Sequence, residues 1–154
     1  MNLLLVYATN SGSTFEVANQ ISGKLTEAGH QVNVKNVTEI SYLDFPNYDV
    51  VILGSPSWDY EGQEGHPHQD FMNLINNTPP NTTYIGRKFA VFGLGDSNYT
   101  IFCGAVTHLT DYVTKLQGTL TCEPLRLDQY YNNMDTANQK ISDWVTSQLL
   151  PKLE

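Results

Sequence analysis

Six consecutive residues near the start of the chain have side chains suited to binding an anion without a cation. They are Thr9, Asn10, Ser11, Gly12, Ser13 and Thr14, and a helical pattern begins near Ser13. Backbone N–H groups at a helix N-terminus attract phosphate, and hydroxyl groups can complete its hydrogen bonding. The segment lacks the lysine of a P-loop, so we predict a phosphate site that does not hydrolyse magnesium nucleotides. A simple helix cap is the alternative, but five polar side chains exceed what a cap needs.

Two later segments combine glycine or proline with an aromatic residue. Residues 54–60 read GSPSWDY, and residues 93–99 read GLGDSNY. Trp58 in a polar loop favours a stacking role over a core position. The second segment alone is weak evidence, because it lacks the third glycine of a dinucleotide-binding fingerprint. Together, a phosphate site and two aromatic residues suit a planar ring with a phosphate tail, which describes FMN.

These segments need secondary-structure elements that bring them to one place. Short apolar runs predict strands buried on both faces at residues 3–7, 32–37, 50–53, 89–92 and 119–127. Apolar residues at helical spacing alternate with these runs and predict four or five helices, with at most a short helix in residues 38–46. We therefore expect an α/β doubly wound sandwich, with a five-stranded parallel sheet and helices on both faces. Ligands bind such sheets at the carboxyl ends of strands, so we expect the loops after strands one, three and four to form the site.

Composition and charge limit the class of protein. With 154 residues, of which 40% are hydrophobic, we expect one globular domain spanning residues 1–154. We expect no membrane insertion, no secretory signal, a cytoplasmic location and a monomer. A net charge of −8 argues against nucleic acid and favours basic protein surfaces as partners. No Lys or Arg lies between Lys35 and Arg87, so we expect one strongly negative side.

Cysteine and histidine positions give no metal or nucleophile motif. Cys103 and Cys122 lack CxxC spacing, so we predict core thiols and leave a bridge between them open. His66 and His68 flank Pro67, but without a cysteine or a fixed carboxylate they predict a solvated loop rather than a metal pair. We therefore predict no metal site and no catalytic residue.

The three polar segments occur in the order and spacing typical of flavodoxins, and the chain resembles that family along essentially its whole length. Residues 9–14 resemble the family's phosphate loop, residues 57–59 its first flavin-ring loop, and residues 93–99 with 102–105 its second. No long insertion interrupts residues 118–127, so the chain resembles the short-chain class. Residues 60–68 form a longer segment than in typical short members.

The resemblance implies the flavodoxin-like strand order 2-1-3-4-5 and FMN as a non-covalent cofactor. It implies that residues 9–14 bind the phosphate, that Trp58 and Tyr99 flank the flavin ring, and that Asp96 lies near its pyrimidine edge. The expected cofactor-binding residues are Thr9, Asn10, Ser11, Gly12, Ser13, Thr14, Ser55, Pro56, Ser57, Trp58, Asp59, Tyr60, Gly93, Leu94, Gly95, Asp96, Tyr99, Phe102 and Cys103.

The function implied by the resemblance is a low-potential one-electron carrier that cycles between semiquinone and hydroquinone and is not itself an enzyme. Its expected partners are redox proteins with basic surfaces, such as a flavodoxin or ferredoxin reductase or a photosystem-type donor, and acceptor oxidoreductases. The alternative is an FMN-dependent NAD(P)H quinone or nitro-compound reductase on the same fold. A flavin-binding module for signalling or assembly is a third class.

Overall fold

The computed structural model describes residues 1–60 and 62–153, with Asp59 and Tyr60 described by their backbone alone. The strands are β1 (Asn2–Tyr7), β2 (Gln31–Asn36), β3 (Val50–Tyr60), β4 (Gln63–Pro67), β5 (Lys88–Gly95), β6 (Thr119–Leu120) and β7 (Leu125–Asp128). The α-helices are α1 (Ser13–Glu27), α2 (Gln69–Asn77), α3 (Gly104–Lys115) and α4 (Met134–Asp143). A π-helical segment (Trp144–Leu149) and a 3-10 turn (Leu150–Lys152) continue α4, and further 3-10 turns span Val37–Glu39, Tyr42–Asn47 and Tyr130–Asn132.

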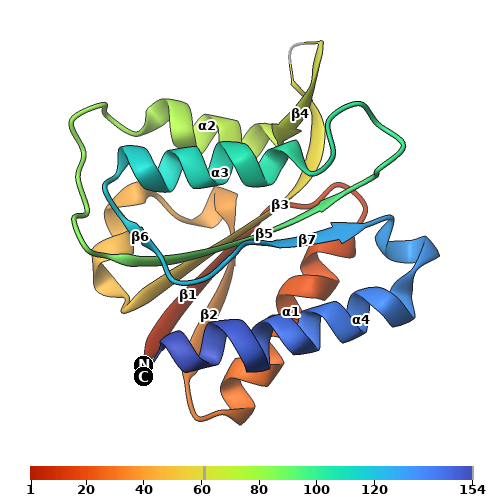
Figure 1. Ribbon diagram of the computed structural model, residues 1–154. Coiled ribbons are helices and arrows are strands. Elements are labelled where there is room, and N and C mark those ends of the chain that lie inside the picture. Colours follow the sequence, from red (N-terminus) through yellow and green to blue (C-terminus); the bar gives the residue numbers. More distant parts are fainter. Residues whose placement is uncertain (61, 154) are drawn as a thin grey trace.

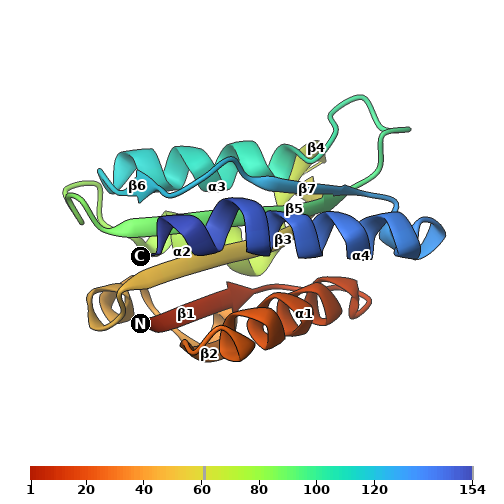
Figure 2. The ribbon, with the colours of Figure 1, turned by 60° about the horizontal axis from the view of Figure 1, so that its bottom comes forward.

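The main sheet is parallel and has the strand order β2-β1-β3-β5, with β6 and β7 both paired to the outer side of β5. The expected order 2-1-3-4-5 is confirmed when β5 is counted as the fourth strand and β6 with β7 as the fifth. Helices α2 and α3 cover one face of the sheet, and α1 and α4 cover the other (Figures 1 and 2). No helix in residues 1–60 or 62–153 is long and apolar enough to cross a membrane.

Strand β1 explains why the sheet is covered on both faces. Leu3 and Leu5 pack in the core beneath α1 and α4, whereas Leu4 and Val6 pack in the core beneath α2 and α3. Side chains of a strand alternate between faces, so a continuous apolar run such as LLLV needs an apolar layer on each side. All four of these side chains are fully buried. The two cores therefore hold β1 in the centre of the molecule.

The predicted fifth strand at residues 119–127 is wrong in its continuity. Leu120 pairs with Phe89 and Leu125 pairs with Phe92, so this strand advances five residues while β5 advances three. Pro124 lies in the interruption and has no N–H to donate to the ladder. The indole N–H of Trp144 donates to the carbonyl of Glu123 at 2.8 Å, which satisfies a backbone group that the sheet leaves free.

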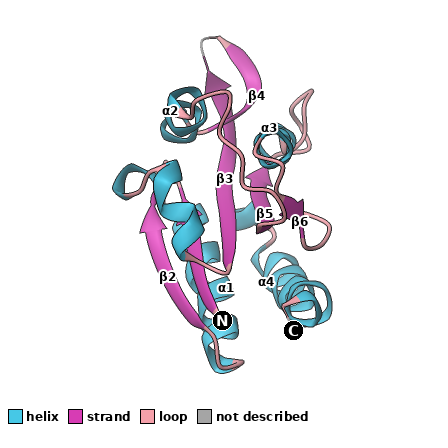
Figure 3. Ribbon diagram, turned by 90° about the vertical axis from the view of Figure 1, so that its left-hand side faces the viewer, coloured by secondary structure: helices cyan, strands magenta, loops and turns pink. Residues whose placement is uncertain are grey.

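The predicted loop at residues 54–60 is also wrong, because β3 continues through it. Beyond the parallel sheet, β3 pairs with β4 as an antiparallel hairpin, with Ser57 opposite Pro67 and Trp58 opposite His66. Figure 3 shows β3 running past α2 into this hairpin. The interpretation of His66 and His68 as part of a solvated loop is wrong. His66 lies in β4 and stacks on His108 of α3, with ring centroids 4.3 Å apart, and His68 caps α2 with its side chain only 17% exposed.

Two glycines allow the hairpin to lie against α3. A Cβ added to Gly104 would collide with the backbone of Gly65, which itself has φ +81°. Only glycine at position 104 leaves room for the hairpin backbone at this distance. The contact matters for the site because β4 and the start of α3 flank the two flavin-ring segments that the sequence predicts.

We predict that Gly104→Ala lowers the free energy of unfolding by about 1–3 kcal/mol, because the added methyl group overpacks a backbone contact. Gly23→Ala in α1 is the matched control. Nothing lies within 4 Å of a Cβ at Gly23, and its backbone is helical. This control should raise stability by roughly 0.5–1 kcal/mol. Denaturant unfolding of wild type and both variants tests the contact. If Gly104→Ala is as stable as wild type, the contact between Gly104 and Gly65 is not close-packed.

Candidate cofactor site

Two adjoining cavities open at the carboxyl edge of the parallel sheet. One, of about 260 Å³, lies between the β3–β4 hairpin and the loop after β5. The other, also of about 260 Å³, extends to the residues before α1 and to the turn after β7. The two share Ser57, Trp58, Asp96 and Tyr99. The three segments that the sequence predicts as loops of one site therefore lie together.

The phosphate-loop candidate enters α1 through a glycine. Gly12 is the N-cap residue with φ +95°, in the left-handed region that side chains with a Cβ rarely adopt. The hydroxyl oxygen of Thr9 accepts a hydrogen bond from the N–H of Gly12 at 2.9 Å, which closes the loop upon itself. Glycine has no side chain to cap the helix, and N–H groups of a first helical turn have no partner within the helix. Asn10, Ser11 and Ser13 line the cavity beside them.

Thr14 supplies the clearest sign that a ligand is accommodated here. The residue is 0% exposed, and its Oγ1 has no hydrogen-bond partner among the described residues. A buried hydroxyl without a partner is destabilising, and native proteins rarely leave one. Because Thr14 lies in the first turn of α1, an anion at that helix N-terminus would supply the acceptor.

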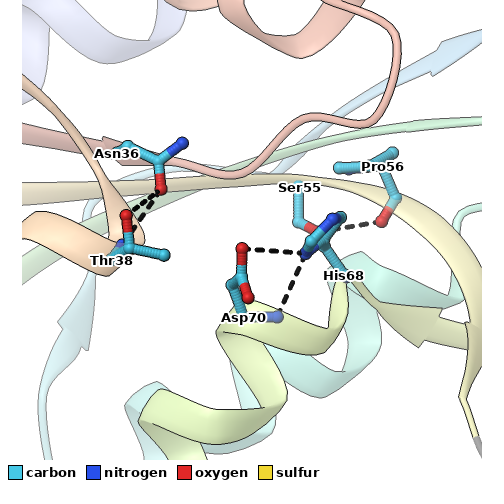
Figure 4. A network of polar contacts seen from close by, with 6 residues as sticks. All are labelled: Asn36, Thr38, Ser55, Pro56, His68 and Asp70. Atoms are coloured by element: carbon cyan, nitrogen blue, oxygen red, sulfur yellow. Dashed lines mark hydrogen bonds and ion pairs between the residues drawn. The ribbon is translucent and has the colours of Figure 1, made fainter.

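Residues 55–58, in the first segment predicted to contact the flavin ring, differ in where their side chains lie. Some make hydrogen bonds within the protein, and others line the cavities. Ser55 is buried, and its hydroxyl donates to the carbonyl of Pro56 at 2.8 Å and accepts from the N–H of His68 at 2.9 Å (Figure 4). The His68 ring in turn accepts from the N–H of Asp70 at 3.0 Å, which caps α2. The hydroxyl of Ser55 is thus committed to the protein, and any contact with a cofactor would come from its backbone.

Pro56, Ser57 and Trp58 do line the cavities. Ser57 Oγ also accepts from the N–H of Ala105 at 3.1 Å, which ties the segment to the first turn of α3. The indole of Trp58 is 53% exposed, which is unusual for a large aromatic side chain unless a partner covers it. The side chains of Asp59 and Tyr60 lie outside the described part of the structure, so their expected roles stay predictions.

The second ring segment makes a tight turn. The N–H of Tyr99 donates to the carbonyl of Asp96 at 3.1 Å, and the N–H of Asn98 donates to the Asp96 carboxylate at 2.8 Å. Leu94, Gly95, Asp96 and Tyr99 line the second cavity. Tyr99 is 65% exposed. At the far end of the loop, the N–H of Ile101 donates to Glu64 of β4 at 3.1 Å, so the hairpin also supports this segment.

The structure places the remaining predicted residues behind the site. Gly93 is buried against Val106 of α3, and Cys103 is buried with its thiol directed at the carbonyls of Gly93 and Leu127. Burial raises the pKa of the Cys103 thiol to about 12, so this group stays protonated. Both cysteines are free, which settles the bridge that the sequence left open. Phe102 is partly exposed and does not line either of the two cavities described above.

Sequence reasoning missed a fourth contribution, from the turn after β7. Gln129, Tyr130, Tyr131 and Asn132 line the second cavity. The hydroxyl of Tyr131 approaches the carbonyl of Ser11 at 3.4 Å, which brings this turn against the phosphate-loop candidate. A signal was available in the sequence, because two tyrosines and three amide side chains directly follow a predicted strand at the same edge of the sheet.

Comparisons with known proteins agree with this architecture. A family model described as flavodoxin matches residues 5–144. A flavodoxin of Maridesulfovibrio salexigens is 33% identical over 126 residues, which cover 81% of this chain and 84% of that protein. Oxidised flavodoxin 2 of Bacillus cereus superposes with a TM-score of 0.78 at 29% identity, covering 94% of this chain and 95% of the other. Protoporphyrinogen IX dehydrogenase (quinone) of Escherichia coli is 32% identical over 75 residues, which cover 49% of this chain and 39% of that enzyme.

A doubly wound sheet with an uncapped helix N-terminus and two exposed aromatic residues at its carboxyl edge is typical of flavin-binding α/β proteins. On the family match and the similarity of sequence and structure, the chain belongs to the flavodoxin family. Members of this family bind FMN and carry electrons, so this chain is an FMN-binding electron carrier. The residues present fit the group, because the unpaired Thr14 hydroxyl and the uncapped first turn of α1 suit its phosphate.

Proposed function

We propose that FMN binds across the two adjoining cavities, with its phosphate at the N-terminus of α1 and its ring between Trp58 and Tyr99. The observation that carries this proposal is the unpaired Oγ1 of Thr14 at the base of a loop that leads into the cavity. Hydroxyl and amide groups at positions 9–14 complete the hydrogen bonding of the phosphate. The shared lining by Trp58 and Tyr99 supports the position of the ring.

Bound FMN supplies the redox chemistry, and the chain supplies orientation and an electrostatic environment. Glu64 and Asp96 line the cavities, whereas no Lys or Arg lines either one in the described part of the chain. Negative charge near the ring disfavours a further electron. We therefore propose a low-potential carrier that works between the semiquinone and hydroquinone forms, without a substrate reaction of its own.

Thr14→Val tests the phosphate position, because the change replaces a hydroxyl with a methyl group of the same shape. The variant should weaken FMN binding by roughly tenfold, since it removes one hydrogen bond to a charged group. Riboflavin has no phosphate and should bind both proteins equally weakly. Without flavin, Thr14→Val should be at least as stable to unfolding as the wild-type apoprotein, because a buried unpaired hydroxyl is removed.

Fluorescence titration of each flavin into the apoproteins, with denaturant unfolding beside it, gives all of these quantities. The two proteins differ in one buried atom, so a difference confined to FMN reports on the phosphate. Equal affinities of wild type for FMN and riboflavin would exclude the proposed position of the phosphate.

The reductase alternative makes a different prediction for NAD(P)H. An enzyme of that kind needs the nicotinamide ring to reach one face of the flavin, whereas Trp58 and Tyr99 are proposed to cover both faces. Mixing the FMN-loaded protein with NADPH or NADH in the absence of oxygen should leave the yellow colour unchanged for minutes. A catalytic amount of a flavodoxin reductase should then bleach it. Rapid bleaching without the reductase would favour the enzyme.

We propose partner redox proteins with basic surfaces, such as a flavodoxin or ferredoxin reductase and acceptor oxidoreductases. The net charge of −8 and the carboxylates of Glu64 and Asp128 beside the site support electrostatic steering toward such partners. A cytoplasmic location and a monomeric state remain predictions from the sequence.

Electron transfer with a basic reductase should slow as ionic strength rises from about 10 to 300 mM, because the screening length becomes shorter. Stopped-flow rates at limiting protein concentration measure this dependence. Salts of different ions at equal ionic strength serve as the control for specific ion effects. A second-order rate constant that does not change with ionic strength would show that steering by charge plays no part.

A further inference from the structure

The loop between β5 and α3 must be held in place by contacts with neighbouring elements. Residues 96–103 contain no helix or strand. The loop nevertheless carries Asp96 and Tyr99, which line both cavities. Glu64 of the hairpin holds the end near Ile101 through one hydrogen bond at 3.1 Å. The end near Asp96 is held by more hydrogen bonds, from Asp128 at the end of β7 and from Gln129, which follows it.

Asp128 binds the loop through two hydrogen bonds to a single residue. One carboxylate oxygen accepts from the N–H of Ser97 at 2.9 Å, and the other accepts from the hydroxyl of Ser97 at 2.7 Å. Bidentate contacts to a carboxylate are directional and stronger than contacts between neutral groups. The same two hydrogen bonds, with help from Lys140, lower the pKa of Asp128. The carboxylate is therefore ionised wherever the protein is folded near neutral pH.

Gln129 adds a second connection beside the first. Its N–H donates to the carbonyl of Gly95 at 2.8 Å, and its side-chain amide donates to the Asp96 carboxylate at 3.1 Å. The amide oxygen of Gln129 accepts from the side chain of Asn132 at 3.1 Å, which orients the amide group. Gln129 makes these contacts with φ +44°, a left-handed conformation that is unfavourable for a residue with a Cβ. Such strain persists only where surrounding contacts compensate for it.

We propose that Asp128 and Gln129 are positioning residues, which hold the loop after β5 so that Asp96 and Tyr99 stand ready to receive the flavin ring. The inference rests on the proposed position of FMN. Asp128 lines neither of the two cavities and acts through Ser97. Gln129 also lines the second cavity, and its positioning role is exerted through Asp96. The parallel pairing of Gly95 with Asp128 places the two segments side by side at the sheet edge, so the contacts are short and local.

The experiment compares Asp128→Asn, Ser97→Ala and the double variant with wild type. Ser97 is exposed, so Ser97→Ala should leave folding intact. Each single variant should weaken binding of FMN and of riboflavin by the same factor, roughly three- to tenfold, because the contact acts on the ring and not on the phosphate. Ser97→Ala removes the hydroxyl hydrogen bond and keeps the one from the N–H, whereas Asp128→Asn weakens both. The loss of affinity in the double variant should therefore be smaller than the product of the two single losses, since both changes act on one connection.

Three further variants separate positioning from charge and from general destabilisation. Asp135→Asn in the first turn of α4 removes the same charge at an exposed position and should leave both affinities within about twofold of wild type. Ser97→Thr keeps the hydroxyl and the N–H and should bind both flavins with wild-type affinity. Gln129→Glu places a second carboxylate beside Asp96 and should weaken the binding of both flavins at neutral pH. The visible circular dichroism of bound FMN should change in the variants that weaken binding and not in Asp135→Asn.

The outcomes distinguish this inference from the function on which it rests. If wild type does not bind FMN, the proposed position of the cofactor fails first. If wild type binds FMN but Asp128→Asn and Ser97→Ala bind both flavins as tightly as Asp135→Asn does, the positioning role is overturned. Loss of FMN affinity alone, with riboflavin unaffected, would place the effect at the phosphate and would also overturn it. Effects that multiply in the double variant would show that the two residues act separately.

Discussion

Parallel pairing of four neighbouring strands is the constraint on which the site depends. Tyr7 at the end of β1 pairs with Gly54 in β3, and Gly54 pairs with Phe92 in β5. At the other side, Gly95 at the end of β5 pairs with Asp128 at the end of β7. Parallel strands end at a common edge, so the segments that follow them must meet there. Burial of both sheet faces leaves this edge as the place where polar groups can gather without entering a core.

Hydrogen bonds between the segments then determine their shapes. A hydroxyl from β3, a carboxylate from the hairpin and a carboxylate from β7 each accept from a backbone N–H of another segment, at Ala105, Ile101 and Ser97 respectively. In each case a side chain satisfies a main-chain donor that no helix or strand would pair. The loop after β5 and the start of α3 are consequently positioned by β3, the hairpin and β7. A substitution at a residue that does not contact the flavin can therefore alter flavin binding.

Local patterns in the sequence predict the buried parallel strands and the phosphate loop, whereas the order of the strands follows from the resemblance to flavodoxins. Four apolar residues in β1 require two buried faces, and hydroxyl residues before a helix indicate an anion site. The β3–β4 hairpin was missed because its pairing joins residues such as Trp58 and His66 across a turn, which periodicity along one strand does not reveal. Membership of a predicted site also says little about which way a side chain points. Ser55 and Cys103 are among the expected cofactor-binding residues, yet both side chains are buried and directed at backbone groups. The turn after β7 was missed because only the loops after three strands were considered.

The carboxylates around the site affect both its electrostatic potential and its shape. In the proposed position, the dianionic phosphate of FMN binds an acidic chain whose loop holds no Lys or Arg, so the attraction must come from N–H dipoles and hydroxyls that act over a short range. Glu64 and Asp96 line the cavity between the hairpin and the loop after β5, and Asp128 contacts that loop through Ser97, so their carboxylates would disfavour an electron added to a ring in the proposed position. Each of these carboxylates also accepts hydrogen bonds that shape the segments around the ring. Amides in their place would weaken those hydrogen bonds as well as the negative potential, because a neutral acceptor binds an N–H less strongly than a carboxylate does. The same side chains thus give the site both its shape and its negative potential, and neither property can be changed alone at these positions.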